Sequence, residues 1–284
     1  MNVLTAPAGR RGSATALAPS LFISHGSPMF AVLPGALGPR LRSLGASLEG
    51  IRAVLVVSPH WQTRDMRVMT TPKPATIHDF GGFPEALYQL QYTPDGAPAL
   101  ADEAARLLTE AGFDITLDAA RGLDHGAWVP LLHLLPDANV PVFQVSMPFD
   151  LGTVGALRLG QALAPLRAQG VLVIGSGSLT HNLYEVRRDV RDPEYAVEFA
   201  HWAHAAVRAN DIEALVDYRR RAPHAARAHP TEEHYLPLVV ALGAAQAGDL
   251  PQLIYGGITD GILSMDSFAW GLPDSAETHR LGAA

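Results

Sequence analysis

Short apolar runs rich in branched residues recur along the chain, and each is followed by small or turn-forming residues. Three such runs lie at residues 21–23, 53–57 and 171–174, with two more at 141–146 and 252–255. Continuous apolar runs of this length are typical of strands that are buried on both faces of a parallel sheet. The pattern therefore predicts five strands, of which 252–255 gives the weakest signal.

Segments with a helical spacing of apolar residues lie between these runs. The clearest begins at Pro98, repeats apolar residues every three or four positions and stops before Gly112, which is the usual order of helix start and stop residues. Further helices are expected over residues 153–168, 194–209 and 236–247. Alternating strands and helices predict an α/β fold, a single domain with a mostly parallel central sheet flanked by helices.

The expected domain covers residues 21–272, preceded by a flexible N-terminal segment at 1–20 and followed by a C-terminal tail at 273–284. The stretch 72–98 is rich in Pro and Gly and has no clear periodicity. Long irregular segments inside a domain often carry function. We interpret this one as a functional surface loop rather than a linker.

Composition excludes several classes of function. The 284 residues hold 21 Lys and Arg against 28 Asp and Glu, a net charge of −7, which argues against a nucleic-acid partner because phosphate binding needs a basic surface. No apolar run approaches the roughly 18 residues that span a bilayer, so we expect a cytoplasmic protein without a membrane partner. The chain has no Cys and 12 His. Any metal must therefore be held by His, Asp or Glu.

Histidines follow three of the predicted strands at similar places. His25, His60 and His181 each come shortly after one of the apolar runs. The carboxyl ends of parallel strands meet at one edge of a sheet, where ligands bind, so we expect these side chains to lie together. Imidazole is a common metal ligand. The pattern favours a metal site at the carboxyl edge of the sheet.

A fourth candidate ligand is His234, which stands three residues before Pro237. Proline is tolerated in the first turn of a helix and not in its interior, so a helix begins close to His234. Such helix starts commonly face ligand sites. The role of the nearby His229 stays open.

Residues 77–84 combine side chains that suit a binding wall. His78, Asp79, Phe80 and Phe83 stand there with two glycines. Aromatic rings beside a few polar groups are typical of small-molecule pockets. We expect this segment to close over a flat substrate.

His125 is the candidate for proton transfer. It directly follows Asp124, a carboxylate that could orient the ring or raise its pKa, as general acid–base catalysis requires. We expect the remaining histidines to have structural or surface positions: His133 packs against leucines, and His201 and His204 share a solvent-facing side of a helix.

The motifs, in this order, resemble those of the class III extradiol ring-cleavage dioxygenases, in particular their DOPA-dioxygenase-type branch. The matching segments span residues 25 to 237 and are Ser24-His25-Gly26-Ser27-Pro28, Ser58-Pro59-His60-Trp61, His78-Asp79-Phe80-Gly81-Gly82-Phe83-Pro84, Asp124-His125-Gly126, His181-Asn182-Leu183 and Glu233-His234-Tyr235-Leu236-Pro237. The resemblance implies one mononuclear non-haem metal site and the opening of a catechol ring with O2. It also implies that His25, His60 and His234 are metal ligands, that His181 is a fourth ligand or a near neighbour, and that His125 is the acid/base.

Several alternatives remain at this point. Histidine ligands suit Fe(II) and Zn(II) alike, and Glu233 could join them. A zinc site could instead activate a water for hydrolysis, and a relative without catalysis could use the pocket to bind a partner. The oligomeric state has no signal in the sequence.

Overall fold

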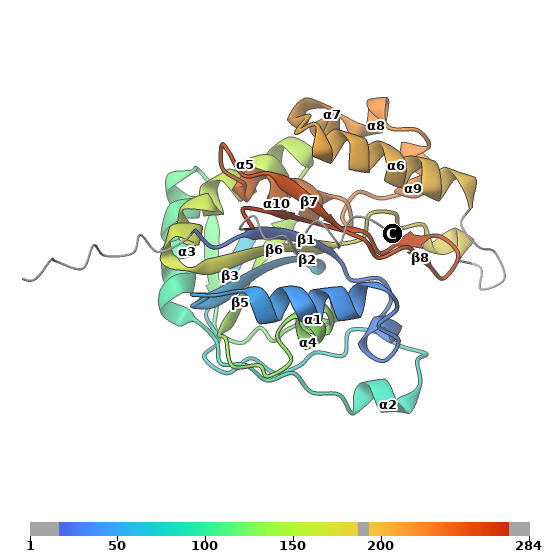
Figure 1. Cartoon of the computed structure of the whole chain (residues 1–284). Coiled ribbons are helices and arrows are strands. Elements are labelled where there is room, and N and C mark those ends of the chain that lie inside the picture. The colour runs from blue at the N-terminus through green and yellow to red at the C-terminus, as the bar shows by residue number, and fades with distance from the viewer. Residues whose placement is uncertain (1–16, 187–192, 273–284) are drawn as a thin grey trace, which may run out of the picture.

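The computed structural model describes residues 17–186 and 193–272 (Figure 1). In this part of the chain, eight strands form one sheet in the order β4-β3-β5-β2-β6-β1-β10-β7, and β8 and β9 pair separately. The strands are β1 Ser20–Ser24, β2 Ala53–Thr63, β3 Met66–Met69, β4 Ile115–Asp118, β5 Val142–Pro148, β6 Val171–Gly177, β7 Pro251–Ile254, β8 Ile258–Thr259, β9 Leu263–Ser264 and β10 Ser267–Trp270.

The centre of the sheet is parallel. Strands β5, β2, β6 and β1 pair in parallel with one another, whereas β10 and β7 add an antiparallel edge beside β1. At the other edge, β3 is antiparallel to β5 and parallel to β4. All five predicted strands are present, and the predicted fold class is confirmed.

The helices of the described residues lie on both faces of the sheet. They are α1 Leu37–Ser47, α2 Glu85–Tyr88, α3 Pro98–Glu110, α4 His125–Leu134, α5 Thr153–Leu163, α6 Glu194–Arg208, α7 Ile212–Val216, α8 Tyr218–Arg221, α9 Ala225–Ala228 and α10 Leu236–Ala244, with 3-10 turns at Pro28–Ala31, Ala164–Gln169 and Leu183–Glu185. The predicted helix over 153–168 divides at Ala164 because Pro165 cannot continue the hydrogen bonding of α5.

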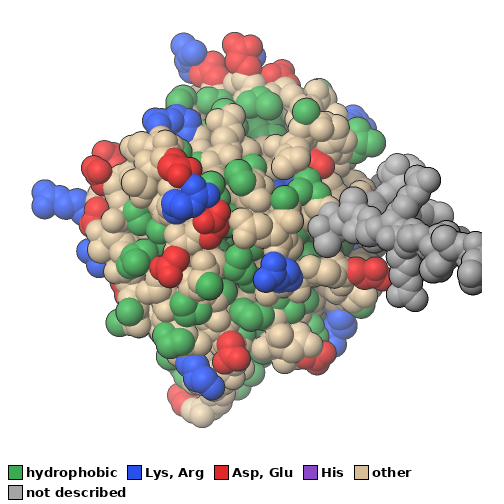
Figure 2. Space-filling view, turned by 90° about the vertical axis from the view of Figure 1, so that its left-hand side faces the viewer, with side chains coloured by type: hydrophobic (Ala, Val, Ile, Leu, Met, Phe, Trp, Pro, Cys, Tyr) green, Lys and Arg blue, Asp and Glu red, His purple; other side chains and the backbone are tan. Residues whose placement is uncertain are grey.

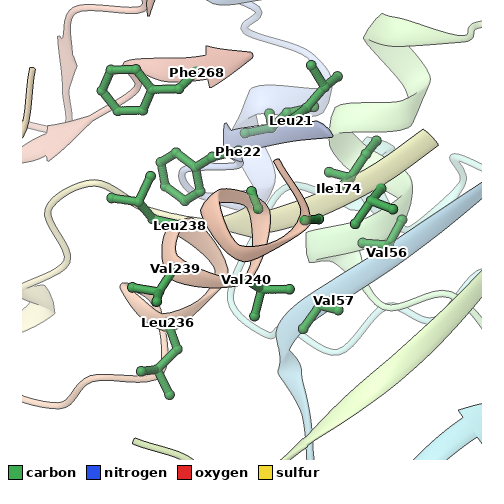
Figure 3. Packing of buried hydrophobic residues seen from close by; sticks show 14 of the residues in the cluster. Leu21, Phe22, Val56, Val57, Ile174, Leu236, Leu238, Val239, Val240 and Phe268 are labelled. Atoms are coloured by element: carbon green, nitrogen blue, oxygen red, sulfur yellow. The ribbon is translucent and has the colours of Figure 1, made fainter. Parts of the chain in front are cut away.

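The core lies between the sheet and two helical layers. Helices α10, α5 and α3 cover one face, and α1 and α4 cover the other. Every residue of α10 is buried. Phe22 of β1 and Val57 of β2 lie on the side of the sheet that faces α10, whereas Leu21 and Ile174 lie on the opposite side (Figure 3). Burial of each such side chain contributes about 1.5–3 kcal/mol. This packing fixes the ends of β1, β2 and β6 relative to the start of α10.

The amino ends of the central strands form the surface at the other end of the molecule, away from the start of α10. Figure 2 shows basic and acidic side chains interspersed there with small apolar areas. Mixed charge of this kind is ordinary for a solvated face. In the described part of the chain, no helix has both the length and the apolar character needed to cross a membrane.

The predicted boundaries are only partly within the described residues. Residues 1–16 and the predicted tail at 273–284 lie outside them. Ala18 and Ser20 are buried and β1 begins at Ser20, so regular structure begins before the expected boundary at residue 21. The stretch 72–98 is largely irregular, as predicted; it contains α2 and ends at Pro98, the first residue of α3.

Candidate metal centre

Three histidines that are far apart in the sequence meet at the carboxyl edge of the sheet. His25 directly follows β1, His60 lies in β2 at a register irregularity between Val57 and Gln62, and His234 precedes α10. Their ring centres are 5.0–5.4 Å apart. One ring nitrogen of each lies within 4.8 Å of the others.

An oxygen atom stands next to the Nδ1 atom of each of these rings. Nδ1 of His25 is 3.0 Å from Ser176 Oγ, Nδ1 of His234 is 3.1 Å from Glu233 Oε1, and Nδ1 of His60 is 3.6 Å from Asp79 Oδ2. A proton on Nδ1 leaves the Nε2 lone pair free for a metal, and such outer contacts fix the tautomer of a ligand. The three Nε2 atoms are therefore the available donors.

The cluster is neutral at ordinary pH. Burial lowers the pKa of His25 and of His234 well below the usual value, and the neighbouring histidines add to this effect. Burial also lowers the pKa of His60 and of His181 to about 4 in each case. Neutral imidazole is the form that binds metals.

The donor set fits one divalent metal ion. Nε2 of His25 lies 3.1 Å from Nε2 of His60, and two ligands at about 2.1 Å from one ion at right angles are about 3 Å apart. Nε2 of His234 is buried and has no hydrogen-bond partner. An unpaired buried nitrogen is costly unless a bound group satisfies it.

His181 lies beside this cluster, and its ring is stacked on one ring of the cluster. The ring stacks on that of His234 with centres 3.4 Å apart and planes 9° apart. Nitrogen lone pairs lie in the ring plane, so two parallel stacked rings direct them side by side and not to one point. A ligand atom of His181 instead forms a second group with Glu233 and His234.

His125 is held by Asp79. The residue begins α4, its backbone N donates to Asp79 Oδ1 at 2.8 Å, and its Nδ1 lies 2.9 Å from Asp79 Oδ2. Burial raises the pKa of Asp79, but the hydrogen bonds and charge of His125 outweigh burial and lower it to about 2. The His125 ring centre is 3.9 Å from that of His60. A proton-transfer group thus stands next to the candidate metal ligands.

The expectation that Asp124 orients His125 was wrong. Asp124 is the N-cap residue of α4, and its carboxylate accepts hydrogen bonds from Ser58 Oγ, Gln144 Nε2 and Arg121. These contacts hold β2 in place next to His60. Sequence reasoning missed this network because its members come from three separate segments, around Ser58, Asp124 and Gln144.

The segment 77–84 forms an aromatic wall beside His125. The ring centre of Phe80 is 5.7 Å from that of His125, 5.4 Å from that of Phe83 and 5.3 Å from that of Tyr88. His78 Nε2 donates to the carbonyl oxygen of Leu90 at 3.0 Å. The four residues predicted for this wall are therefore close together, with Asp79 engaged by His125.

Three of the other described histidines, His133, His204 and His229, have structural partners. His229 is buried, its Nε2 donates to Leu179 O at 2.9 Å, and burial lowers its pKa to about 3. His133 Nε2 donates to Phe30 O. His204 differs from the prediction of a solvent-facing side chain, because its Nε2 lies 2.9 Å from the buried carboxylate of Asp266. His201 is exposed, as expected.

The chain is similar to known proteins over most of its length. Its relatives include two proteins named "4,5-DOPA dioxygenase extradiol", from Beta vulgaris and Escherichia coli. That of Beta vulgaris is 40% identical over 265 residues, covering 90% of this chain and 98% of the relative. That of Escherichia coli is 37% identical over 253 residues, covering 87% and 92%. A crystal structure of an uncharacterized Escherichia coli K12 protein superposes with a TM-score of 0.73 at 30% identity, covering 89% of this chain and 99% of that chain.

The family comparison covers most of the described domain. Residues 21–261 match a protein family described as the catalytic LigB subunit of aromatic ring-opening dioxygenase. The match contains every candidate site residue and confirms the resemblance that the sequence motifs carried. The chain therefore belongs to the LigB family of aromatic ring-opening dioxygenases.

Proposed function

We propose that this ring-opening dioxygenase cleaves a catechol of the DOPA type with O2 by extradiol opening, at one metal ion held by His25, His60 and His234. The observation that carries the proposal is the meeting of three neutral imidazole nitrogens within 4.8 Å of one another. A protein that supplies few ligands on one side of an ion leaves positions for substrate. The names of the relatives support the substrate class.

The metal would supply Lewis acidity and redox chemistry for the reaction of the catechol with O2. Fe(II) is the proposed reactive ion, and Zn(II) also suits the same nitrogen donors. The protein's own part is to hold three donors neutral at pH 7 and to keep their lone pairs turned inward. Ser176, Asp79 and Glu233 serve the second purpose through Nδ1 of each ring.

His125 is the proposed acid/base. Its Nδ1 faces the ionised carboxylate of Asp79 and therefore carries the proton, so Nε2 has a free lone pair. That atom can accept a proton from a catechol hydroxyl and return it later in the reaction. Asp79 stabilises the protonated ring in between.

The proposed substrate wall consists of His78, Phe80 and Phe83, with Asp79 behind His125. Phe80 contacts the edge of the His125 ring and would lie against the flat face of a catechol. Aromatic contacts of this kind orient a ring and exclude water.

We assign His181 as a neighbour of the metal centre and not as a fourth ligand, because it stacks on His234. A His181→Ala variant should keep its metal, whereas His25→Ala and His60→Ala should each lose it. Elemental analysis of the three purified variants measures this. Unchanged metal content in both His25→Ala and His60→Ala would refute the ligand set.

The function itself is tested with iron-loaded protein and DOPA, prepared without oxygen and then aerated. The expected result is O2 uptake together with a yellow ring-opened product. Turnover without oxygen would point to metal-assisted hydrolysis instead. The cytoplasmic location remains a prediction, which cell fractionation would test.

A further inference from the structure

Ser176 lies at the carboxyl end of β6, between the candidate metal ligands and the start of α4. It is fully buried. Its Oγ lies 3.0 Å from Nδ1 of His25 and also donates a hydrogen bond to the carbonyl oxygen of Gly126. The serine therefore contacts a metal-ligand candidate and the residue next to His125 at once.

The chemistry of these three groups fixes the direction of both hydrogen bonds. A backbone carbonyl oxygen only accepts, so the single O–H of Ser176 donates to Gly126 O. The Ser176 oxygen then has only lone pairs left for His25. Nδ1 of His25 must consequently carry the proton in this contact.

We propose that Ser176 is a positioning residue that sets the tautomer of His25, so that Nε2 presents its lone pair to the metal. The proposal rests on the proposed function only in treating His25 as a ligand. Nε2 of His25 faces Nε2 of His60 at 3.1 Å, which agrees with a lone pair on that side. Outer contacts that fix a histidine ligand typically change metal affinity 10- to 100-fold when they are lost.

The same serine also sets the spacing between the metal centre and the acid/base. Gly126 follows His125 in the first turn of α4, so the bond from Ser176 ties that turn to β6. A side chain at Gly126 would collide with Ser58 Oγ and with the ring of His60. Contacts with β6 and with β2 therefore hold this turn on both sides. Loss of the serine hydroxyl would remove the contact with β6.

The test compares Ser176→Ala with Ser20→Ala. Ser20 is also a fully buried serine in a central strand, and its Oγ donates to Ala241 O at 2.8 Å, at the far end of β1. Both variants lose one buried hydrogen bond to a carbonyl, but only Ser176 touches a candidate ligand. Metal affinity is measured by competing zinc against a chromophoric chelator, with no catechol or oxygen present.

Ser176→Ala should bind zinc about 10- to 100-fold more weakly than the wild type, whereas Ser20→Ala should bind it within about twofold. Ser176→Thr, which keeps the hydroxyl, should restore most of the affinity. Equal zinc affinity in Ser176→Ala and Ser20→Ala would overturn the proposal.

A second measurement is made on the wild-type protein, with His25→Ala used only to assign signals. Nitrogen NMR of histidine-labelled, metal-free wild-type protein reports which ring nitrogen of His25 carries the proton, with the His25 signals assigned by their loss in His25→Ala. The expected state has the proton on Nδ1; a proton on Nε2 would overturn the proposal. Neither readout uses ring opening, so failure here is distinct from failure of the proposed dioxygenase reaction.

Discussion

Replacement of Asp79 by Asn tests the account of His125. The carboxylate accepts the backbone N–H of His125 at 2.8 Å and faces its Nδ1 at 2.9 Å. Asparagine has a similar shape but no charge, and its amide group can donate to Nδ1. The His125 proton would then move to Nε2, where it blocks the lone pair that accepts the substrate proton.

The expected fall in kcat follows from the strength of the hydrogen bond between Asp79 and the His125 ring. A hydrogen bond to a charged group contributes about 1.5–3 kcal/mol, and each 1.36 kcal/mol in the barrier changes the rate about tenfold. We therefore expect Asp79→Asn to lower kcat about 10- to 150-fold. Asp79 also faces Nδ1 of His60, so the variant should bind metal more weakly, and its kcat is therefore compared at saturating iron.

The assay is steady-state O2 uptake by iron-loaded protein over a range of catechol concentrations. Asp95→Asn is the matched control, since Asp95 belongs to the same Pro- and Gly-rich stretch but is exposed and lies 3.8 Å from Lys73. The control should keep the wild-type kcat. A kcat for Asp79→Asn within twofold of the wild type, at full metal content, would refute the role given to the His125–Asp79 pair.

Three other predictions concern stability and substrate binding. Burial lowers the pKa of His229 to about 3 in the folded state, whereas the residue keeps its ordinary value of about 6.5 in the unfolded chain. Below pH 6.5 the unfolded chain therefore binds more protons, and the free energy of unfolding falls as the pH falls. Each buried histidine of this kind should lower the free energy of unfolding by about 2 kcal/mol between pH 7 and pH 5. Urea titrations of metal-free protein measure this change, and equal stability at both pH values would contradict it. Asp124→Ala should lower the free energy of unfolding by about 3–5 kcal/mol, because Arg121 keeps a partly buried charge without its partner. A loss below about 1 kcal/mol in the same titration would show that Asp124 does not stabilise this region. Phe80→Ala should raise KM for DOPA about tenfold, equal to about 1.4 kcal/mol, with unchanged zinc affinity; an unchanged KM would remove Phe80 from the wall.

The central fold could be predicted because its strands are continuous apolar runs. Residues 21–23, 53–57 and 171–174 carry that signal directly, and they belong to the parallel strands β1, β2 and β6. Helix α4 carries no such signal, since almost every residue in it is buried and Pro130 stands inside it. A helix without a polar face shows no amphipathic period.

His25 and His60 could be predicted as ligand candidates because they stand beside the ends of predictable strands, and His234 because Pro237 marks the start of a helix. The partner of His125 could not. Asp79 lies 46 residues away in an irregular segment, while the adjacent Asp124 turns to Ser58 as α4 begins. Ser176 has no sequence signal either, since its role depends on the distance between β6 and α4.

Iron titration of the metal-free protein tests the central claim most directly. Fe(II) is added in steps without oxygen, and the initial rate of O2 uptake with DOPA is measured after aeration at each step. With one metal site per chain, the rate should rise in proportion to added iron and reach a plateau at one iron per chain. O2 uptake by the metal-free protein at the full rate, or no uptake at one bound iron, would contradict this claim.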